Sequence, residues 1–220
     1  MKMISRGAIA LLLILIFVPL IHGQDLSKYR NFSLGMSLAD VSKQVDKNPA
    51  DAMVVHERPA LIQQLTWWPP LNYGSSLQAE AVQQMRFSFF NGELYRVAIT
   101  YDSSATRGLT AEDMVQAMSL KFGTAAKLAG EIAETYGTTD KVLARWEDAQ
   151  FSLNLSRSGL SNNFGLVMLT KQVNTQADAA ITQALKLEQQ GAPQKEADRM
   201  KKAADDLETT RQKNMKVFLP

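Results

Sequence analysis

The 220-residue chain contains no cysteine. This absence excludes disulfide bonds, thiolate metal sites, cysteine nucleophiles and the lipid-modified cysteine of bacterial lipoproteins. Histidine is nearly absent as well, because His56 is the only one beyond residue 23. Most zinc sites and hydrolase triads need an imidazole with several partners. The stretch His56-Glu57-Arg58-Pro59 does not fit the helical zinc-protease (zincin) motif, because Pro59 would break the helix. We therefore interpret His56 as an ordinary loop histidine and expect no metal site.

A surplus of charge is also missing. Two of the 24 lysines and arginines, Lys2 and Arg6, lie in the first 23 residues, which leaves 22 basic and 22 acidic residues in the rest of the chain. A neutral chain lacks the field that draws a protein to nucleic acid or anionic lipid. Its glycines are too dispersed for a phosphate-binding loop. We therefore expect no nucleic-acid partner and no cofactor.

The apolar run near the start is too short to span a bilayer. It covers the fourteen residues from Ala8 to Ile21, whereas a membrane-spanning helix needs about 20. Two basic residues precede the run and Gly23 closes it, an order typical of a secretory signal peptide. We predict cleavage near Gly23, a periplasmic or secreted protein, and no stable membrane insertion afterwards. An uncleaved anchor stays open, because Ile21 is larger than the residues preferred three positions before a cleavage site.

Two helix starts of the same kind lie 73 residues apart. Ser37 and Thr110 are both suited to cap a helix, and each has an aspartate three residues later. Asn48-Pro49 is expected to end the first helix and Gly123 the second. The apolar stripes are Leu38, Val41 and Val45 in the first helix, and Met114, Val115, Met118 and Phe122 in the second. Strand-like segments follow both, which predicts a duplicated unit of one helix and three strands; two unrelated helices are the alternative.

Six strands are expected, and those at residues 82–90, 93–101 and 150–157 each present one apolar face. In the first unit they cover residues 61–68, 82–90 and 93–101, with a strong hairpin signal at Asn91-Gly92. In the second unit they cover residues 142–147, 150–157 and 164–170. Alternation of apolar and polar residues along these segments predicts an α+β fold, with helices on one face of an antiparallel sheet. Whether the two units share one sheet stays open.

A helical tail follows the last strand. Its pattern begins near Thr175, is interrupted at Gly191-Ala192-Pro193 and resumes from Gln194 to about Lys213. The apolar stripe of the second part is thin, comprising Ala197, Met200, Ala204 and Leu207. We expect a weak coiled coil or docking helix, or a solvated extension, whose removal after Gln172 leaves the sheet folded. The chain thus divides into a signal peptide (1–23), a first unit (24–104), a second unit (105–171) and a tail (172–220).

The candidate binding stretch comprises Trp67, Trp68, Pro69, Pro70 and Tyr73. Adjacent residues of a strand point to opposite faces, so the two tryptophans cannot share one side of the sheet. An exposed aromatic ring beside a stiff Pro-Pro segment suits a protein partner or a sugar ring. The alternative is a structural role, with one tryptophan in the core and the other under a loop or the tail.

Carboxylate chemistry has four candidates, Glu93, Asp102, Glu147 and Asp148. A glycosidase needs one carboxyl group in an apolar pocket that raises its pKa. Nothing near these residues indicates such a pocket, and Glu147-Asp148 lies at an expected hairpin tip. We expect no catalytic residue, and a hydrolase is retained only as a second alternative.

Two segments carry a family resemblance: Phe32-x-x-Gly35-Met36-Ser37-x-x-Asp40-Val41 and Phe89-Phe90-Asn91-Gly92-Glu93-Leu94-x-x-Val97. They resemble the small envelope proteins of the SmpA/OmlA (BamE-like) type over residues 32–101, and again over 105–170. The resemblance implies helices on a three-stranded antiparallel sheet, and a tandem of such units resembles the β-lactamase-inhibitory-protein fold. This chain departs from the lipoprotein members by lacking their lipidated cysteine.

The resemblance implies a non-catalytic module for protein-protein contact in the bacterial envelope. An envelope protein is then the expected partner, of unknown identity, and the oligomeric state stays open. The alternative is a binding protein for an envelope glycan or a small ligand, using Trp67, Trp68 and Tyr73.

Overall fold

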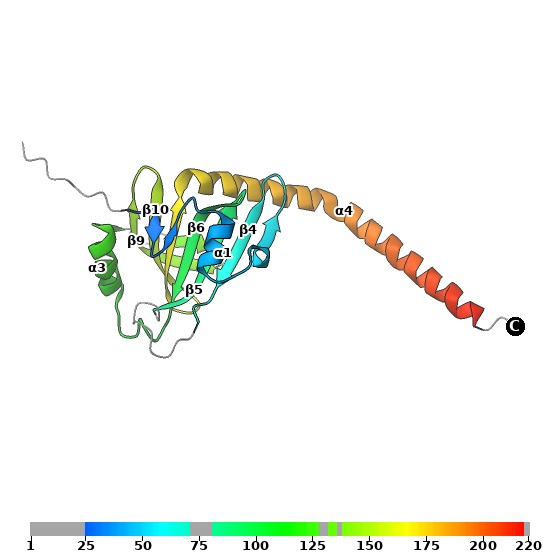
Figure 1. Cartoon of the computed structure of the whole chain (residues 1–220), viewed down its shortest axis with the longest axis horizontal. Helices are drawn as coiled ribbons and strands as arrows, with labels where there is room; N and C mark the ends of the chain where they lie inside the picture. The colour runs from blue at the N-terminus through cyan, green and yellow to red at the C-terminus, as the bar shows by residue number, and fades with distance from the viewer. Residues whose placement is uncertain (1–24, 71–80, 128–131, 136–137, 218–220) are drawn as a thin grey trace, which may run out of the picture.

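The computed structural model describes residues 25–70, 81–127, 132–135 and 138–217, and within them it shows an α+β fold (Figure 1). The elements in chain order are β1 (Lys28–Tyr29), β2 (Phe32–Ser33), α1 (Leu38–Gln44), the 3-10 helix η1 (Pro49–Asp51), β3 (Met53–His56), β4 (Ile62–Trp67), β5 (Val82–Phe90), β6 (Glu93–Tyr101), α3 (Ala111–Phe122), β7 (Ala126–Lys127), β8 (Ile132–Thr135), β9 (Thr138–Glu147), β10 (Phe151–Ser158), β11 (Phe164–Thr170) and α4 (Lys171–Lys216). The expected antiparallel sheet with helices is confirmed.

One sheet contains the strands of both expected units. Its strand order is β3-β4-β5-β6-β11-β10-β9-β7, with β8 also paired to β9. The units meet where β6 and β11 pair antiparallel, from Gly165 opposite Thr100 to Leu169 opposite Arg96. From this pair outward, the first unit contributes β6, β5 and β4, and the second contributes β11, β10 and β9. On each side, the last expected strand of the unit therefore lies at the centre of the sheet. This mirrored order is compatible with a duplicated helix-plus-three-strand unit, and the duplication stays a prediction.

Both predicted helix caps form. The Ser37 hydroxyl accepts a hydrogen bond from the amide of Asp40 at 3.1 Å, and Thr110 makes a reciprocal capping box with Asp113. Gly123 ends α3 at a φ of 82°, which favours glycine. The predicted end of α1 is wrong by four residues: α1 stops at Gln44, and Asn48 instead caps η1.

A single main core joins both units on one face of the sheet, which we call the front face. From the first unit it contains Phe87 on β5 and Val41 on α1, and from the second Leu153 on β10 and Phe122 on α3. The expected inward residues Met85, Phe87 and Phe89 are all fully buried. Because α1 and α3 share this core, the two units are stabilised together.

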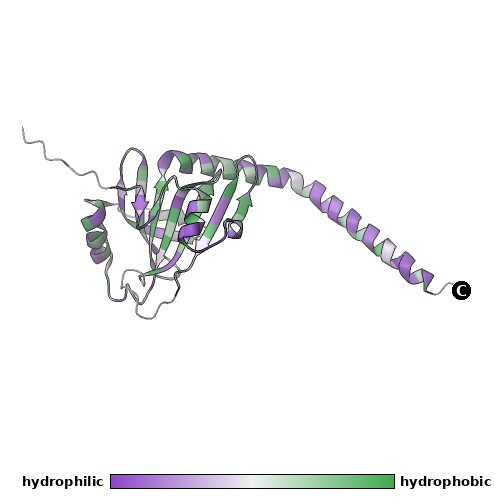
Figure 2. Cartoon of the chain, viewed as in Figure 1, coloured by the Kyte–Doolittle hydropathy of each residue, from purple (hydrophilic) through white to green (hydrophobic). Residues whose placement is uncertain are grey.

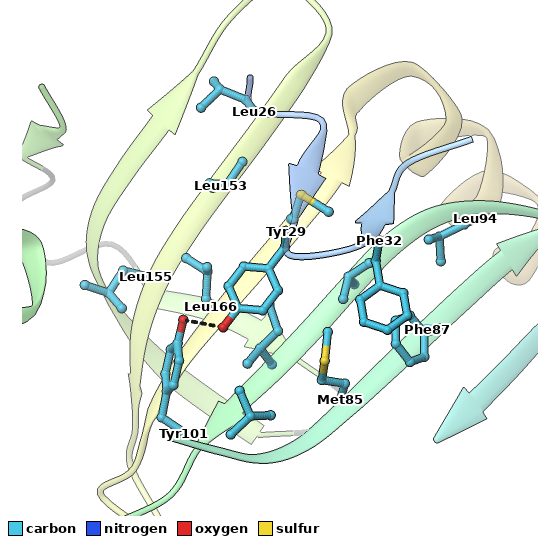
Figure 3. Close-up of a cluster of buried hydrophobic side chains, with 14 of the residues drawn as sticks. Leu26, Tyr29, Phe32, Met85, Phe87, Leu94, Tyr101, Leu153, Leu155 and Leu166 are labelled. Atoms are coloured by element: carbon cyan, nitrogen blue, oxygen red, sulfur yellow. Dashed lines mark hydrogen bonds between the residues drawn. The ribbon is translucent and has the colours of Figure 1, made fainter. Parts of the chain in front are cut away.

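An N-terminal hairpin that the sequence did not reveal lies on the same face. Strands β1 and β2 pair with each other, apart from the main sheet. Tyr29 and Phe32 of this hairpin point onto the front face (Figure 3), where the Phe32 ring lies 4.7 Å from that of Phe87. Leu26 is buried with them. The core therefore begins three residues after the predicted cleavage site.

A β-bulge directs one aromatic residue to the other face of the sheet, the back face. Ser88 pairs with Arg96 and Phe89 with Leu94, so Tyr95 is an extra residue on β6. Leu94 stays in the front core, whereas Tyr95 joins Ile62 in a second buried cluster. A small apolar area thus forms on the back face.

The first part of α4 covers this second cluster. Ala177, Ala180 and Ala184 are buried and recur every three or four residues, which places them on one side of the helix. Ala177 contacts the cluster directly, and Val173 and Ile181 pack against it from the same helix. The short alanine side chains let α4 lie close to the sheet.

The predicted interruption of the tail at Gly191-Ala192-Pro193 is wrong, because α4 continues through Pro193 as one helix of 46 residues. Proline removes one backbone N–H and crowds the preceding turn, which bends a helix without always ending it. Figure 1 shows α4 following the sheet and then leaving it at an angle. Residues from Ala192 onward are exposed, so a bend there meets no packed neighbour and water can satisfy the freed carbonyl.

The buried Tyr101 hydroxyl gives the fold an alkaline limit. It lies 3.4 Å from the Tyr29 hydroxyl under the N-terminal hairpin (Figure 3). Burial, and next the neighbouring Tyr29, raise the pKa of Tyr101 well above its ordinary value of 10. The folded protein therefore keeps this proton where the unfolded chain loses it, so this contribution to stability is complete below about pH 10 and falls as the pH rises further.

We expect absorbance at 295 nm to show one tyrosine that titrates only as the protein unfolds. In Tyr101→Phe this late step should vanish, and the free energy of unfolding should depend less steeply on pH above 10. A late step of unchanged size in the Tyr101→Phe variant would contradict the assignment.

Candidate functional site

The candidate binding stretch is divided between core and surface. Trp67 ends β4 and packs, partly buried, against the front core, whereas the Trp68 side chain is 60% exposed. Pro69 is partly buried and Pro70 is exposed. Tyr73 lies outside the described residues. Trp67 thus has a structural contact, and the two tryptophans do not form one aromatic platform.

A second exposed apolar area lies at the edge of the sheet, on β3. Among the described residues β3 pairs with β4 alone, so the other side of its backbone is open. Its side chains Met53, Val54 and Val55 are 58%, 44% and 38% exposed. An open strand edge with apolar side chains is a template for pairing with another chain.

Helix α4 turns this edge into a groove, which we call the arm-root groove. The groove has a volume of about 550 Å³, with Val54 and Val55 on the β3 side and Ala184 and Leu187 on the α4 side. Leu187 is 46% exposed, so the apolar area of β3 continues onto the helix. Charged side chains of both signs, Glu57, Arg58, Glu188 and Lys195, lie around it.

His56 links the two walls of the arm-root groove, β3 and α4, through a polar contact. It is the last residue of β3, and its Nδ1 lies 3.0 Å from Oε1 of Glu188 on α4. The His56 side chain is only 9% exposed. The predicted loop histidine is therefore a strand residue that joins β3 to α4, and sequence spacing could not show a contact across 132 residues.

From this groove onward, α4 forms an exposed helical arm, which we define as residues 191–216. At a rise of 1.5 Å per residue it extends about 40 Å. Its surface is mostly hydrophilic (Figure 2), with ion pairs such as Arg199–Glu196 and Arg211–Glu208 along the helix. Met200 and Leu207 are 65% and 70% exposed. The expected thin apolar stripe therefore faces solvent along its length.

Three of the four candidate carboxylates, Asp102, Glu147 and Asp148, have local partners. Glu93 and Asp102 lie at opposite ends of β6, about 30 Å apart at 3.3 Å per residue. Asp102 binds the backbone and hydroxyl of Ser104 in a turn, and the hydroxyl bond lowers its pKa.

Glu147 and Asp148 hold the start of α4 at the β9–β10 turn. Glu147 pairs with Lys171 at 2.8 Å, and the hydrogen bond from Lys171 lowers the pKa of Glu147. Asp148 accepts backbone hydrogen bonds from Gln150 and Phe151, as expected for a hairpin tip. Their contacts are those of a structural turn.

Within the described ranges, no group of three histidine, aspartate or glutamate side chains is placed to bind a metal ion. Nor does any helix of those ranges have the length and apolar character to cross a bilayer. Comparison of the chain with family models, curated proteins and solved structures gives no match. The resemblance to SmpA/OmlA-type proteins therefore stays a prediction.

The sequence reasoning missed the arm-root groove. The run Met53-Val54-Val55 is rich in β-branched residues and could have been recognised as a short strand. It has no alternation of polar and apolar residues, so nothing indicated an edge. Its neighbour in space, Leu187, is more than 130 residues away in the chain.

Proposed function

We propose that this chain is an exported, non-catalytic protein-protein interaction module of the bacterial envelope. The observation that carries the proposal is the arm-root groove, an apolar strand edge that continues onto a helix and opens beside a 40 Å exposed arm. A sheet domain with one projecting helix presents a long surface that its own fold does not use.

Two further features support this assignment. Apolar side chains that form one continuous exposed area are a mark of interaction sites. Val54, Val55 and Leu187 form such an area along the groove, rimmed by Glu57, Arg58 and Lys195. The signal-peptide pattern and the resemblance to envelope proteins favour export, and the core beginning at Leu26 fits a mature chain that starts near Gln24.

The partner is expected to dock an extended segment along β3, with an apolar side chain inserted toward Leu187. Addition of a strand to an open sheet edge satisfies the backbone groups of β3, and the groove then selects the side chain. The arm would provide a second contact through Met200 and Leu207.

Affinity capture from envelope extract tests the proposal. We expect the purified protein to retain a specific partner. In Leu187→Glu the amount of captured partner should fall at least about ten-fold, because a charge would be buried at the centre of the interface. Leu160→Glu is the matched control, since Leu160 is 85% exposed on the β10–β11 loop.

Two results would contradict the proposal. If no protein is captured specifically by any variant, the interaction function is wrong. If Trp68→Ala abolishes capture while Leu187→Glu does not, the binding surface is the tryptophan edge and not the arm-root groove. Trp67 is left unchanged, because its substitution would also disturb the core.

A further inference from the structure

A pocket lies on the back face of the sheet, at the end opposite to α4. It has a volume of about 200 Å³ and is bordered by Arg86 of β5 and Asp140 of β9. The strands β6, β11 and β10 separate these two residues. Neighbouring strands lie about 4.8 Å apart, so four steps would cover about 19 Å in a flat sheet. Residues from both strands line one small pocket because the sheet curls around its back face.

The floor of the pocket is formed by small residues. Gly165 lies between Thr100 of β6 and Ser156 of β10, and Ala98 adjoins it on β6. A Cβ on Gly165 would contact Oγ of Ser156 and the carbonyl of Ile99 at 3.4 Å. A larger side chain at position 165 would therefore extend into the pocket.

The walls combine apolar side chains such as Phe164 and Val167 with a set of polar groups. Hydroxyl groups come from Thr100, Ser156, Ser158 and Ser161, and amides from Gln84 and Asn163. Ser156 is only 6% exposed. Buried polar groups are normally satisfied by partners, so such a wall favours a ligand that forms many hydrogen bonds over an apolar one.

Asp140 provides the most specific indication. Its Oδ1 is buried and has no hydrogen-bond partner among the described residues. A buried carboxylate oxygen without a donor is costly, so this position favours a ligand with O–H or N–H groups. A negatively charged ligand would be repelled by this carboxylate, which favours a neutral one.

We propose that this pocket binds a neutral, hydroxyl-rich ligand of monosaccharide size. Asp140 accepts from ligand hydroxyls, and Gly165 leaves room for the ring. The volume is below the 300 to 1,000 Å³ typical of sites for drug-sized molecules, which limits the ligand to about one sugar unit. This site is distinct from the arm-root groove and from the Trp67-Trp68 stretch, so it does not depend on the proposed protein partner.

Titration of the ¹⁵N-labelled protein by NMR tests this site. Glucose, galactose, mannose and N-acetylglucosamine are the probes, and glycine is the zwitterionic comparison. We expect at least one sugar to cause saturable shifts in the amides of Ala98, Ser156 and Gly165, and glycine to cause none.

Two variants separate the site from nonspecific effects. Asp140→Asn should weaken sugar binding by roughly ten-fold or more, because a hydrogen bond to a charged group is replaced by a weaker one. Gly165→Leu should abolish it, with folding confirmed by the spectrum itself. Asp46→Asn is the matched charge control, since Asp46 is exposed, lies in the turn after α1 and has a φ of 52° that asparagine tolerates.

The inference is overturned if no sugar gives saturable shifts up to about 100 mM, well above a millimolar dissociation constant. It is equally overturned if Asp140→Asn binds as the unchanged protein does, or if glycine alone binds. Should Gly165→Leu fail to fold, Asp140→Asn still decides the result.

Discussion

Phe87→Ala is expected to lower the free energy of unfolding by about 3 to 5 kcal/mol, the usual cost of truncating a buried phenylalanine. Phe87 is fully buried at the centre of β5, between strands β4 and β6. Its ring also contacts Phe32 at 4.7 Å, which attaches the N-terminal hairpin to the sheet. The substitution thus leaves a cavity and loosens a second element.

Equilibrium unfolding in urea measures this effect, and the circular dichroism spectrum establishes that the variant is folded at zero urea. Met53→Ala is the control, because Met53 is 58% exposed on β3 and its truncation should change stability by no more than about 0.5 kcal/mol. Similar losses in the two variants would show that Phe87 is not part of a tightly packed core.

Deletion of residues 173–220 is expected to destabilise the protein by several kcal/mol, whereas deletion of residues 191–220 is expected to change its stability little. The shorter deletion removes the exposed arm only. The longer one also removes Ala177, Ala180 and Ala184 and uncovers Ile62 and Tyr95. Full burial of one such apolar side chain contributes about 1.5 to 3 kcal/mol.

This pair of deletions also tests the expectation that removal of the chain after Gln172 leaves the sheet folded. Thermal unfolding of the two shortened proteins beside the full protein measures the difference. We expect the melting temperature to fall clearly for the longer deletion and to stay within about 2 °C for the shorter one. Equal melting temperatures would show that the first part of α4 contributes nothing to the back face.

The helix caps and the central hairpin were predictable because their signals are local. Ser37, Thr110 and Asn91-Gly92 act on backbone groups within a few residues of themselves, so their effect does not depend on the rest of the fold. The strands β5, β6 and β11 have the predicted bounds for the same reason. For β5 and β6, a period of two with one apolar face was enough to place them.

The elements that the sequence did not reveal depend on distant contacts. Strands β1 and β2 have two residues each, too few for a pattern, and form where Tyr29 and Phe32 can reach the core. The extra residue Tyr95 interrupts the alternation of β6, and its position is fixed by α4 on the back face. Pro193 indicated a helix end, yet it only bends a helix that has already left the sheet.

By itself the sequence determined the α+β class, the main apolar faces and the absence of cysteine chemistry, because these follow from composition and from spacings within single elements. Only the tertiary structure decided that both units share one sheet, that Trp67 packs inward while Trp68 is exposed, and that β3 and α4 enclose a groove. It also placed Arg86 and Asp140 around one pocket. These features arise from strand order and sheet curvature, which join residues far apart in the chain and leave no local pattern.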